Sequence, residues 1–162
     1  MSLLLRLAGP KDTLELGRVM AEGMPARPGF AILLEGDLGA GKTTLVRGLV
    51  SALPGGGEAE VSSPSFTMCN LYPTRPEVAH FDLYRQASRP DDQLCESLET
   101  PGCLVIIEWA QYLDSRDLPD DALRLRWEPA ETGRLVRIEA LGEAAGRYLH
   151  GINGKLRRFA AS

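Results

Sequence analysis

The sequence predicts an α/β fold: a three-layer α/β sandwich with a mixed sheet that has an antiparallel hairpin at one edge. Three observations predict it. The runs Phe30–Glu35 and Leu104–Ile107 are short and almost entirely apolar, as buried parallel strands are. A glycine-rich stretch follows the first of them directly and precedes a segment that suits a helix. Residues Ala122–Trp127 and Leu135–Ala140 alternate polar and apolar around a short polar turn, which is typical of a hairpin.

The other elements complete an alternation of strands and helices. Leu3–Leu7 is a candidate first strand, and the helix expected after it, Asp12–Met24, has Asp12 as its candidate N-cap. The β-branched run Leu104–Ile107 is the most hydrophobic of the chain, so we expect it at the sheet centre. The remaining expected elements are a helix at Lys42–Leu53, strands at Phe66–Tyr72 and Val78–Leu83 joined by the turn Pro73–Pro76, and a final helix at Glu143–Phe159.

The composition favours one globular domain over residues 1–162. The chain is 44% hydrophobic and 25% charged, which argues against disorder. No window approaches the roughly 18 consecutive apolar residues of a membrane span, and the first residues lack the pattern of a signal peptide. The net charge of -4 gives no global attraction to nucleic acid. Three widely spaced cysteines favour reduced thiols of a cytoplasmic protein.

The residues Gly36-Asp37-Leu38-Gly39-Ala40-Gly41-Lys42-Thr43 have the spacing G-x-x-x-x-G-K-T of a P-loop. Its glycines permit backbone angles and close approaches that side chains would block. Successive N–H groups and the positive end of the next helix can then face phosphate. Lys42 supplies a charge to the β- and γ-phosphates, and the Thr43 hydroxyl is placed to ligate Mg²⁺. The motif predicts that the chain binds a nucleoside triphosphate.

Hydrolysis also needs a carboxylate that holds the metal or orients water, and two residues are candidates. Glu108 ends the apolar run Leu104–Ile107, and ligands of P-loop folds lie beyond the carboxyl ends of the parallel strands. The alternative for Glu108 is an ordinary exposed acid. In the second candidate strand, alternation places His80, Asp82 and Tyr84 on one face, which suits either a metal site or the solvated face of an edge strand.

Two further features have a plain structural explanation beside a functional one. Ser62–Thr67 is rich in hydroxyl groups and resembles segments that sense the γ-phosphate in nucleotide hydrolases, but it also suits a simple Ser/Pro turn. Trp109 follows Glu108 directly, and its role is either buried packing or recognition and shielding at the site.

In combination, these motifs resemble one family closely. They are, in chain order, Gly36–Thr44 (GDLGAGKTT), Ser63–Thr67 (SPSFT), His80–Arg85 (HFDLYR) and Ile107–Trp109 (IEW). The residues of these motifs and their order are similar to those of the bacterial TsaE (YjeE) family, the P-loop ATPase of tRNA threonylcarbamoyladenosine biosynthesis. The match extends over almost the whole chain, because it also takes in Thr13, Leu16, Gly17, Gly133 and Arg134.

The resemblance implies an ATPase that uses ATP and Mg²⁺ and works in a heteromeric complex with TsaB and TsaD. That complex transfers threonylcarbamoyl to adenosine 37 of tRNAs reading ANN codons, so tRNA is an indirect partner. The residues that the resemblance implies as catalytic are Glu108, Lys42 and Asp82, and those for the metal are Thr43, Glu108 and Asp82. Those implied for the nucleotide are Asp37, Leu38, Gly39, Ala40, Gly41, Lys42, Thr43 and Thr44, with Pro10, Thr13 and Gly133 near the adenine.

Two departures from the family pattern and two alternative functions remain. Ser65 stands where the family usually has threonine, and Gln86–Gly102 only loosely matches the expected acidic helix. A small-molecule or nucleotide kinase would share the P-loop and the size, but the one dense basic stretch, Lys155–Arg158, is terminal and unlike a kinase lid. The other alternative is a binding module that is gated by ATP without hydrolysing it.

Overall fold

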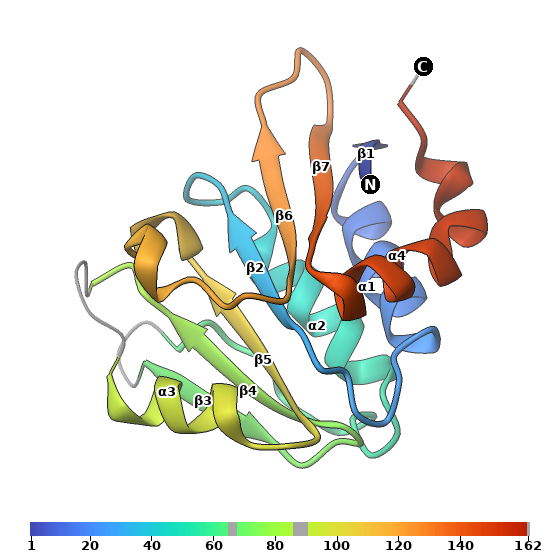
Figure 1. Ribbon diagram of the computed structural model, residues 1–162. Coiled ribbons are helices and arrows are strands. Elements are labelled where there is room, and N and C mark those ends of the chain that lie inside the picture. The colour runs from blue at the N-terminus through green and yellow to red at the C-terminus, as the bar shows by residue number, and fades with distance from the viewer. Residues whose placement is uncertain (65–67, 86–90, 162) are drawn as a thin grey trace.

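The structure is a computed structural model, and it describes residues 1–64, 68–85 and 91–161. A seven-stranded mixed sheet forms its centre, with the strand order β1-β7-β6-β2-β5-β4-β3 (Figure 1). The strands are β1 (Ser2–Leu7), β2 (Ala31–Glu35), β3 (Cys69–Tyr72), β4 (Glu77–Asp82), β5 (Cys103–Glu108), β6 (Ala122–Glu128) and β7 (Arg134–Leu141). The predicted α/β sandwich is confirmed.

The four central strands run parallel, and the outer ones are antiparallel. β2 pairs in parallel with β5 and β6, and β4 pairs in parallel with β5. The predicted hairpin is β6 and β7, and β1 pairs antiparallel with β7 on its outer side. Because parallel strands end at the same edge, the carboxyl ends of β2, β4 and β5 meet there, with Asp82 paired to Glu108 and Leu34 paired to Glu108.

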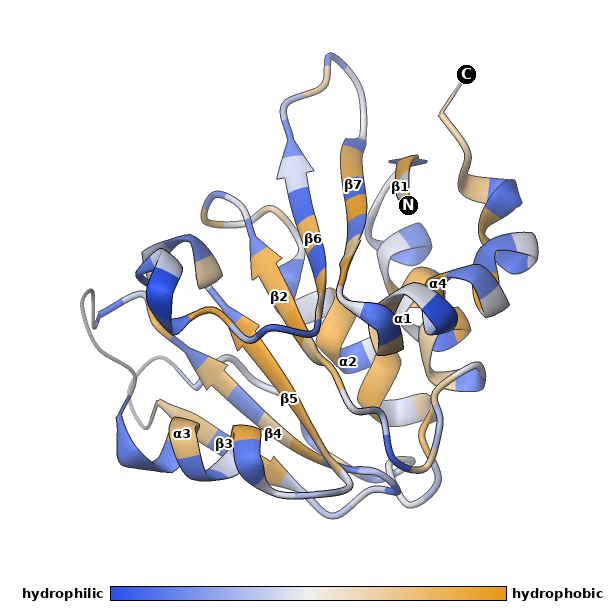
Figure 2. Cartoon of the chain, in the orientation of Figure 1, coloured by the Kyte–Doolittle hydropathy of each residue, from blue (hydrophilic) through white to orange (hydrophobic). Residues whose placement is uncertain are grey.

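Helices cover the two faces of the sheet unequally. One face is covered by three helices: α1 (Pro10–Glu22), α2 (Lys42–Ala52) and α4 (Glu143–Leu156). Each contributes apolar side chains to the core on that face, for example Leu16, Leu45 and Leu149. The other face is covered by α3 (Asp92–Glu99), the short 3₁₀ helix η1 (Ala110–Tyr112), and Leu113 and Leu118 on either side of a second 3₁₀ helix, η2 (Ser115–Asp117), over the apolar residues of β2, β4 and β5. Figure 2 shows β2 and β5 as mostly hydrophobic, whereas β4 is mixed.

Helices α1 and α2 approach each other closely through two glycines. A β-carbon at Gly17 would lie 2.4 Å from the Leu45 carbonyl oxygen, and one at Gly48 would lie 2.2 Å from the Leu14 carbonyl oxygen. No side chain fits at these distances, so both positions require glycine. The close packing fixes α2, and with it the P-loop at its N-terminus, against α1.

Most expected elements are confirmed, but the ends of two helices differ from those expected. Asp12 is not the N-cap of α1: Gly9 is, and Pro10 takes the first helical position, where its fixed φ and missing N–H are tolerated. The Asp12 carboxylate instead accepts a hydrogen bond from the Ala8 N–H at 2.8 Å. The last helix ends at Leu156, and a 3₁₀ turn, η3 (Arg157–Phe159), continues it.

The position of two strands also answers questions that the sequence left open. β5 is an interior strand beside β2, the middle strand of the sheet. β4 lies between β5 and β3, so it is not the solvated edge strand that alternation alone allowed. The expected strand from Phe66 begins at Cys69 in the structure, and its residues 66 and 67 lie outside the described part, as does Ser65. No helix in the described ranges is long and apolar enough to cross a membrane.

Candidate functional site

The P-loop connects the end of β2 to the start of α2, as its motif requires. Gly41 is the N-cap of α2 and has a φ of 118°, a conformation that residues with a β-carbon rarely adopt. Lys42 is only 5% exposed, and its Nζ donates hydrogen bonds to the carbonyl oxygens of Gly36 at 2.6 Å and Asp37 at 2.8 Å. Burial lowers the pKa of Lys42 from its usual value, and nearby carboxylates partly offset this. The site thus holds a buried cation at the N-terminus of α2, which suits a bound anion.

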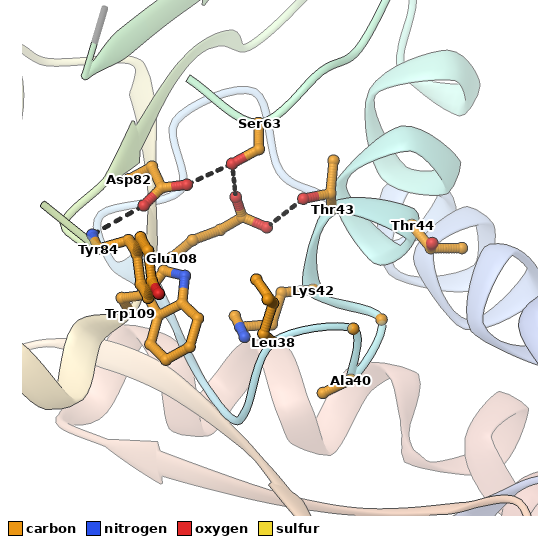
Figure 3. A pocket seen from close by; sticks show the side chains of 12 residues that line it. Leu38, Ala40, Lys42, Thr43, Thr44, Ser63, Asp82, Tyr84, Glu108 and Trp109 are labelled. Atoms are coloured by element: carbon orange, nitrogen blue, oxygen red, sulfur yellow. Dashed lines mark hydrogen bonds between the residues drawn. The ribbon is translucent and has the colours of Figure 1, made fainter. Parts of the chain in front are cut away.

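Two carboxylates face each other beside the loop. Asp82 ends β4 and Glu108 ends β5, they are paired in register, and they are 3% and 1% exposed. The hydroxyl of Ser63 contacts both, Oδ2 of Asp82 and Oε2 of Glu108, the latter at 3.0 Å (Figure 3). The Thr43 hydroxyl donates to Oε1 of Glu108 at 2.8 Å. Glu108 is therefore buried and is not the ordinary exposed acid that was its alternative. Ser63 is not part of a plain turn only, because its hydroxyl contacts both carboxylates.

The ionised form of Glu108 is stabilised despite its burial. Burial raises the pKa of this carboxyl, but the contacts from His80, Thr43 and Ser63 outweigh it and bring the pKa below the usual 4.5. Nε2 of His80 lies 3.2 Å from Oε2 of Glu108, although its N–H is poorly aligned and has no aligned hydrogen-bond partner among the described residues. Asp82 is held differently, since its Oδ1 accepts the Tyr84 N–H at 2.8 Å.

Trp109 is buried in the core and also borders the site. Its indole is 8% exposed and packs into the apolar cluster of the sheet, while its ring lies 4.0 Å from Nζ of Lys42. Tyr84 and Tyr112 flank the indole, with ring centroids 4.8 Å and 5.6 Å away. The residue has a φ of 59°, a strained conformation that clusters at functional sites.

Two cavities lie on either side of the loop. The first, of about 240 Å³, is called here the carboxylate cavity, and its lining includes Leu38–Thr44, Ser63, Asp82, Tyr84, Glu108 and Trp109. The second, of about 320 Å³, is called the hairpin cavity, and its lining includes Pro10, Thr13, Gly39–Gly41, Thr44, Gly133 and Arg134. The two share the residues of the loop tip, so one ligand can contact both.

The structure thus gathers the residues that were predicted for the site. Lys42, Thr43, Asp82 and Glu108 line the carboxylate cavity, and Pro10, Thr13 and Gly133 line the hairpin cavity. Asp37 lies apart from both, in a smaller hollow between the loop and the end of β6, although its carbonyl contacts Lys42.

The sequence analysis did not predict four residues that lie at or beside the site. Arg134 was named only in a motif, and it lines the hairpin cavity. Tyr72, whose hydroxyl lies 3.3 Å from Nδ1 of His80, carries no signal in the sequence. His80 was placed by alternation on a face with Asp82 that suited a metal site, but its contact with Glu108 was not predicted. Trp127 packs beneath the loop, since a β-carbon added at Gly36 would lie 2.9 Å from the Cβ of Trp127. The contact depends on the register of the strands, so the sequence did not predict it.

The donor set suits one kind of metal ion. Among the described residues, no group of three or more His, Cys, Asp or Glu side chains could hold a metal by itself. Mg²⁺ needs no such cage, because it keeps several waters and binds through one or two carboxylates together with phosphate oxygens. The Thr43 hydroxyl and the carboxylates of Asp82 and Glu108 are oxygen donors that converge on the carboxylate cavity, so they fit this ion.

Comparisons with known proteins agree on one family. A family model described as "Threonylcarbamoyl adenosine biosynthesis protein TsaE" matches residues 7–136. A relative from Streptomyces coelicolor, named tRNA threonylcarbamoyladenosine biosynthesis protein TsaE, is 34% identical over 80% of this chain and 90% of its own. A relative of the same name from Nostoc is 43% identical over 66% and 67%. A crystal structure of Bacillus subtilis YdiB superposes with a TM-score of 0.73 at 28% identity and covers 98% of this chain and 95% of that one.

Proposed function

The chain belongs to the TsaE family of tRNA threonylcarbamoyladenosine biosynthesis, and we propose that in this pathway it binds ATP with Mg²⁺ and hydrolyses it. One observation carries the proposal: the P-loop lysine, the next hydroxyl and two strand-end carboxylates line one cavity. Mg²⁺ needs one or two carboxylates, and hydrolysis also needs a carboxylate that orients the attacking water, so both buried acids have a use that offsets their cost of desolvation. Their convergence beside Thr43 is what hydrolysis requires.

Different residues of the chain bind the two ends of the nucleotide. Lys42 and the loop N–H groups neutralise the charge of the β- and γ-phosphates, and the hairpin cavity receives the nucleoside. Thr43, Glu108 and Asp82 would hold Mg²⁺, which supplies charge neutralisation at the phosphoryl group when bound. Glu108 is ionised at neutral pH, so its carboxylate accepts a proton or a hydrogen bond from the attacking water.

The proposal extends to partners. TsaB and TsaD are the proteins with which this chain would act in the cytoplasm, and tRNA would be bound by the complex. The net charge supports binding of tRNA by the complex and not by this chain, since a chain with a net charge of -4 offers little attraction to a polyanion. Exposed apolar side chains lie at the carboxylate cavity: Leu38 and Tyr84 line it, and Tyr112 stacks on Trp109. A partner that covers them would change the access of water to the site.

The test is reconstitution of the modification on tRNA. Purified chain, TsaB, TsaD, tRNA, ATP, Mg²⁺ and a threonylcarbamoyl donor are combined, and threonylcarbamoyladenosine is measured by mass spectrometry of the digested tRNA. We expect the unsubstituted chain and Lys11→Ala, an exposed control on α1, to support the modification, and Lys42→Ala to fail. Full modification with Lys42→Ala would overturn the proposal, and so would phosphorylation of a small acceptor in place of hydrolysis.

A further inference from the structure

A buried line of side chains runs behind Glu108, on the side away from the ligand. Tyr72 of β3, His80 of β4 and Glu108 of β5 follow one another across three neighbouring strands. The Tyr72 hydroxyl lies 3.3 Å from Nδ1 of His80, and Nε2 of His80 lies 3.2 Å from Oε2 of Glu108. His80 is 0% exposed and is not among the described residues that line the carboxylate cavity, and it contacts that lining at Glu108.

The contacts of His80 determine which ring nitrogen carries its hydrogen. Burial raises the pKa of Tyr72, so its hydroxyl remains protonated and able to donate. If Tyr72 donates to Nδ1, then Nε2 carries the hydrogen and lies 3.2 Å from the Glu108 carboxylate, although the N–H is not well aligned with it. The other neutral tautomer would place the Nε2 lone pair 3.2 Å from a carboxylate oxygen, which is repulsive. Tyr72 has a competing acceptor, the Ser62 carbonyl, but at a longer 3.5 Å.

The contacts on the two sides of Glu108 differ in kind. The hydroxyls of Thr43 and Ser63 reach it from the cavity, where a metal or water competes for the same oxygens. His80 reaches it from the interior of the protein, where no ligand enters. The imidazole and the Ser63 hydroxyl contact the same oxygen, Oε2, so the imidazole remains beside the carboxylate when that hydroxyl turns toward a ligand.

We propose that His80, anchored by Tyr72, is a positioning residue that holds the Glu108 carboxylate in the orientation needed for ATP hydrolysis. This inference rests on the proposed function. Side chains that orient a functional carboxylate or a metal ligand in this way change activity by about 10- to 100-fold when removed. His80 does not touch the nucleotide, so its removal acts on turnover and leaves binding intact.

The activity test compares three variants in the presence of TsaB and TsaD. His80→Leu removes the contact, His80→Gln keeps an N–H donor at a similar reach, and Tyr72→Phe removes only the anchor. We expect His80→Leu to lower kcat about 10- to 100-fold with the Kd for ATP within about 3-fold, and His80→Gln to restore most of the loss. Added to Glu108→Gln, His80→Leu should cause no further loss in kcat. An unchanged kcat, or an equal loss in both backgrounds, would overturn the proposal.

A second measurement is independent of hydrolysis. Long-range ¹H–¹⁵N NMR of the unsubstituted protein reports which imidazole nitrogen carries the hydrogen, and the variant His150→Gln assigns the two histidine signals. We expect the Nε2–H form for His80, and a loss of that preference in Tyr72→Phe. An Nδ1–H form would overturn the proposal even if ATP is hydrolysed. An Nε2–H form without any ATP turnover would overturn the proposed function, and with it the role of His80 in turnover.

Discussion

Thr43 Oγ1 donates a 2.8 Å hydrogen bond to Glu108 Oε1, which joins the first turn of α2 to the carboxyl end of β5 across 65 positions of the chain. The contact brings the hydroxyl that follows the P-loop lysine against the acid of a neighbouring strand. Both groups are oxygen donors beside the same cavity. The first prediction concerns this pair.

Thr43→Val removes the hydroxyl and keeps the shape of the side chain. We expect it to weaken ATP binding about 10- to 100-fold in Mg²⁺, the range for a lost hydrogen bond to a charged group, and to change little in EDTA. Isothermal titration calorimetry under both conditions measures this. Thr43→Ser, which keeps the hydroxyl, is the matched control and should bind as the unsubstituted chain does. Equal losses with and without Mg²⁺ would contradict a role at the metal.

The second prediction concerns pH. The pKa of Glu108 is below its usual 4.5, so the stability from its ionised form is present above 4.5 and is lost as the pH falls through the lower folded value. We expect Glu108→Gln to be less stable than the unsubstituted chain near neutral pH. The gap between their free energies of unfolding should shrink as the pH falls below 4.5. Urea denaturation in EDTA measures it, and a gap that widened with acidification would show a raised pKa instead.

The third prediction separates the two cavities. Gly9 lines the hairpin cavity, has extended backbone with a φ of -176°, and has nothing within 4 Å of an added β-carbon. Gly9→Phe should therefore fold, occupy part of the cavity and weaken ATP binding at least about tenfold, which is 1.4 kcal/mol. Binding of inorganic triphosphate should not change. Gly57→Phe, also in open space but outside the cavity, is the control. Equal weakening of both ligands would show that the nucleoside lies elsewhere.

The fourth prediction concerns the packing that supports the P-loop. Gly48→Ala would bring a β-carbon 2.2 Å from the Leu14 carbonyl oxygen, so α1 and α2 must move apart. We expect a loss of about 1–3 kcal/mol in the free energy of unfolding. Gly151→Ala, in helix α4 with nothing within 4 Å, should change stability by between zero and a gain of about 1 kcal/mol. If the two variants had equal stability in urea, the close crossing of the helices would be refuted.

Local patterns in the sequence predict the P-loop, its strand and its helix well. The apolar run before Gly36 and the residues after Lys42 have one consistent interpretation, and the strand-end position of Glu108 follows from the edge at which ligands lie. The family resemblance predicts the rest of the cavity lining. These features depend on residues that are close in the sequence or on a rule that holds for α/β folds in general, that ligands bind at the carboxyl ends of the parallel strands.

Features that depend on strand order could not be predicted. Alternation placed His80 and Asp82 on one face of β4, but it does not say whether that strand is at the edge or inside, because β5 and β3 decide this from elsewhere in the chain. The contact of Tyr72 with His80 needs the register of β3 against β4. The cap of α1 was misjudged because Asp12 is a good capping residue, while Pro10 fixes the helix start two positions earlier.

The most direct test of the account is ATP turnover by Glu108→Gln with TsaB and TsaD present. The substitution keeps the size of the side chain and removes the charge that Thr43, Ser63 and His80 stabilise. The account predicts that the variant binds ATP within about 10-fold of the unsubstituted chain and that its kcat falls at least about 100-fold, the scale of a lost acid–base group. A variant that binds ATP and turns it over at the full rate would contradict the central claim that this carboxylate drives hydrolysis.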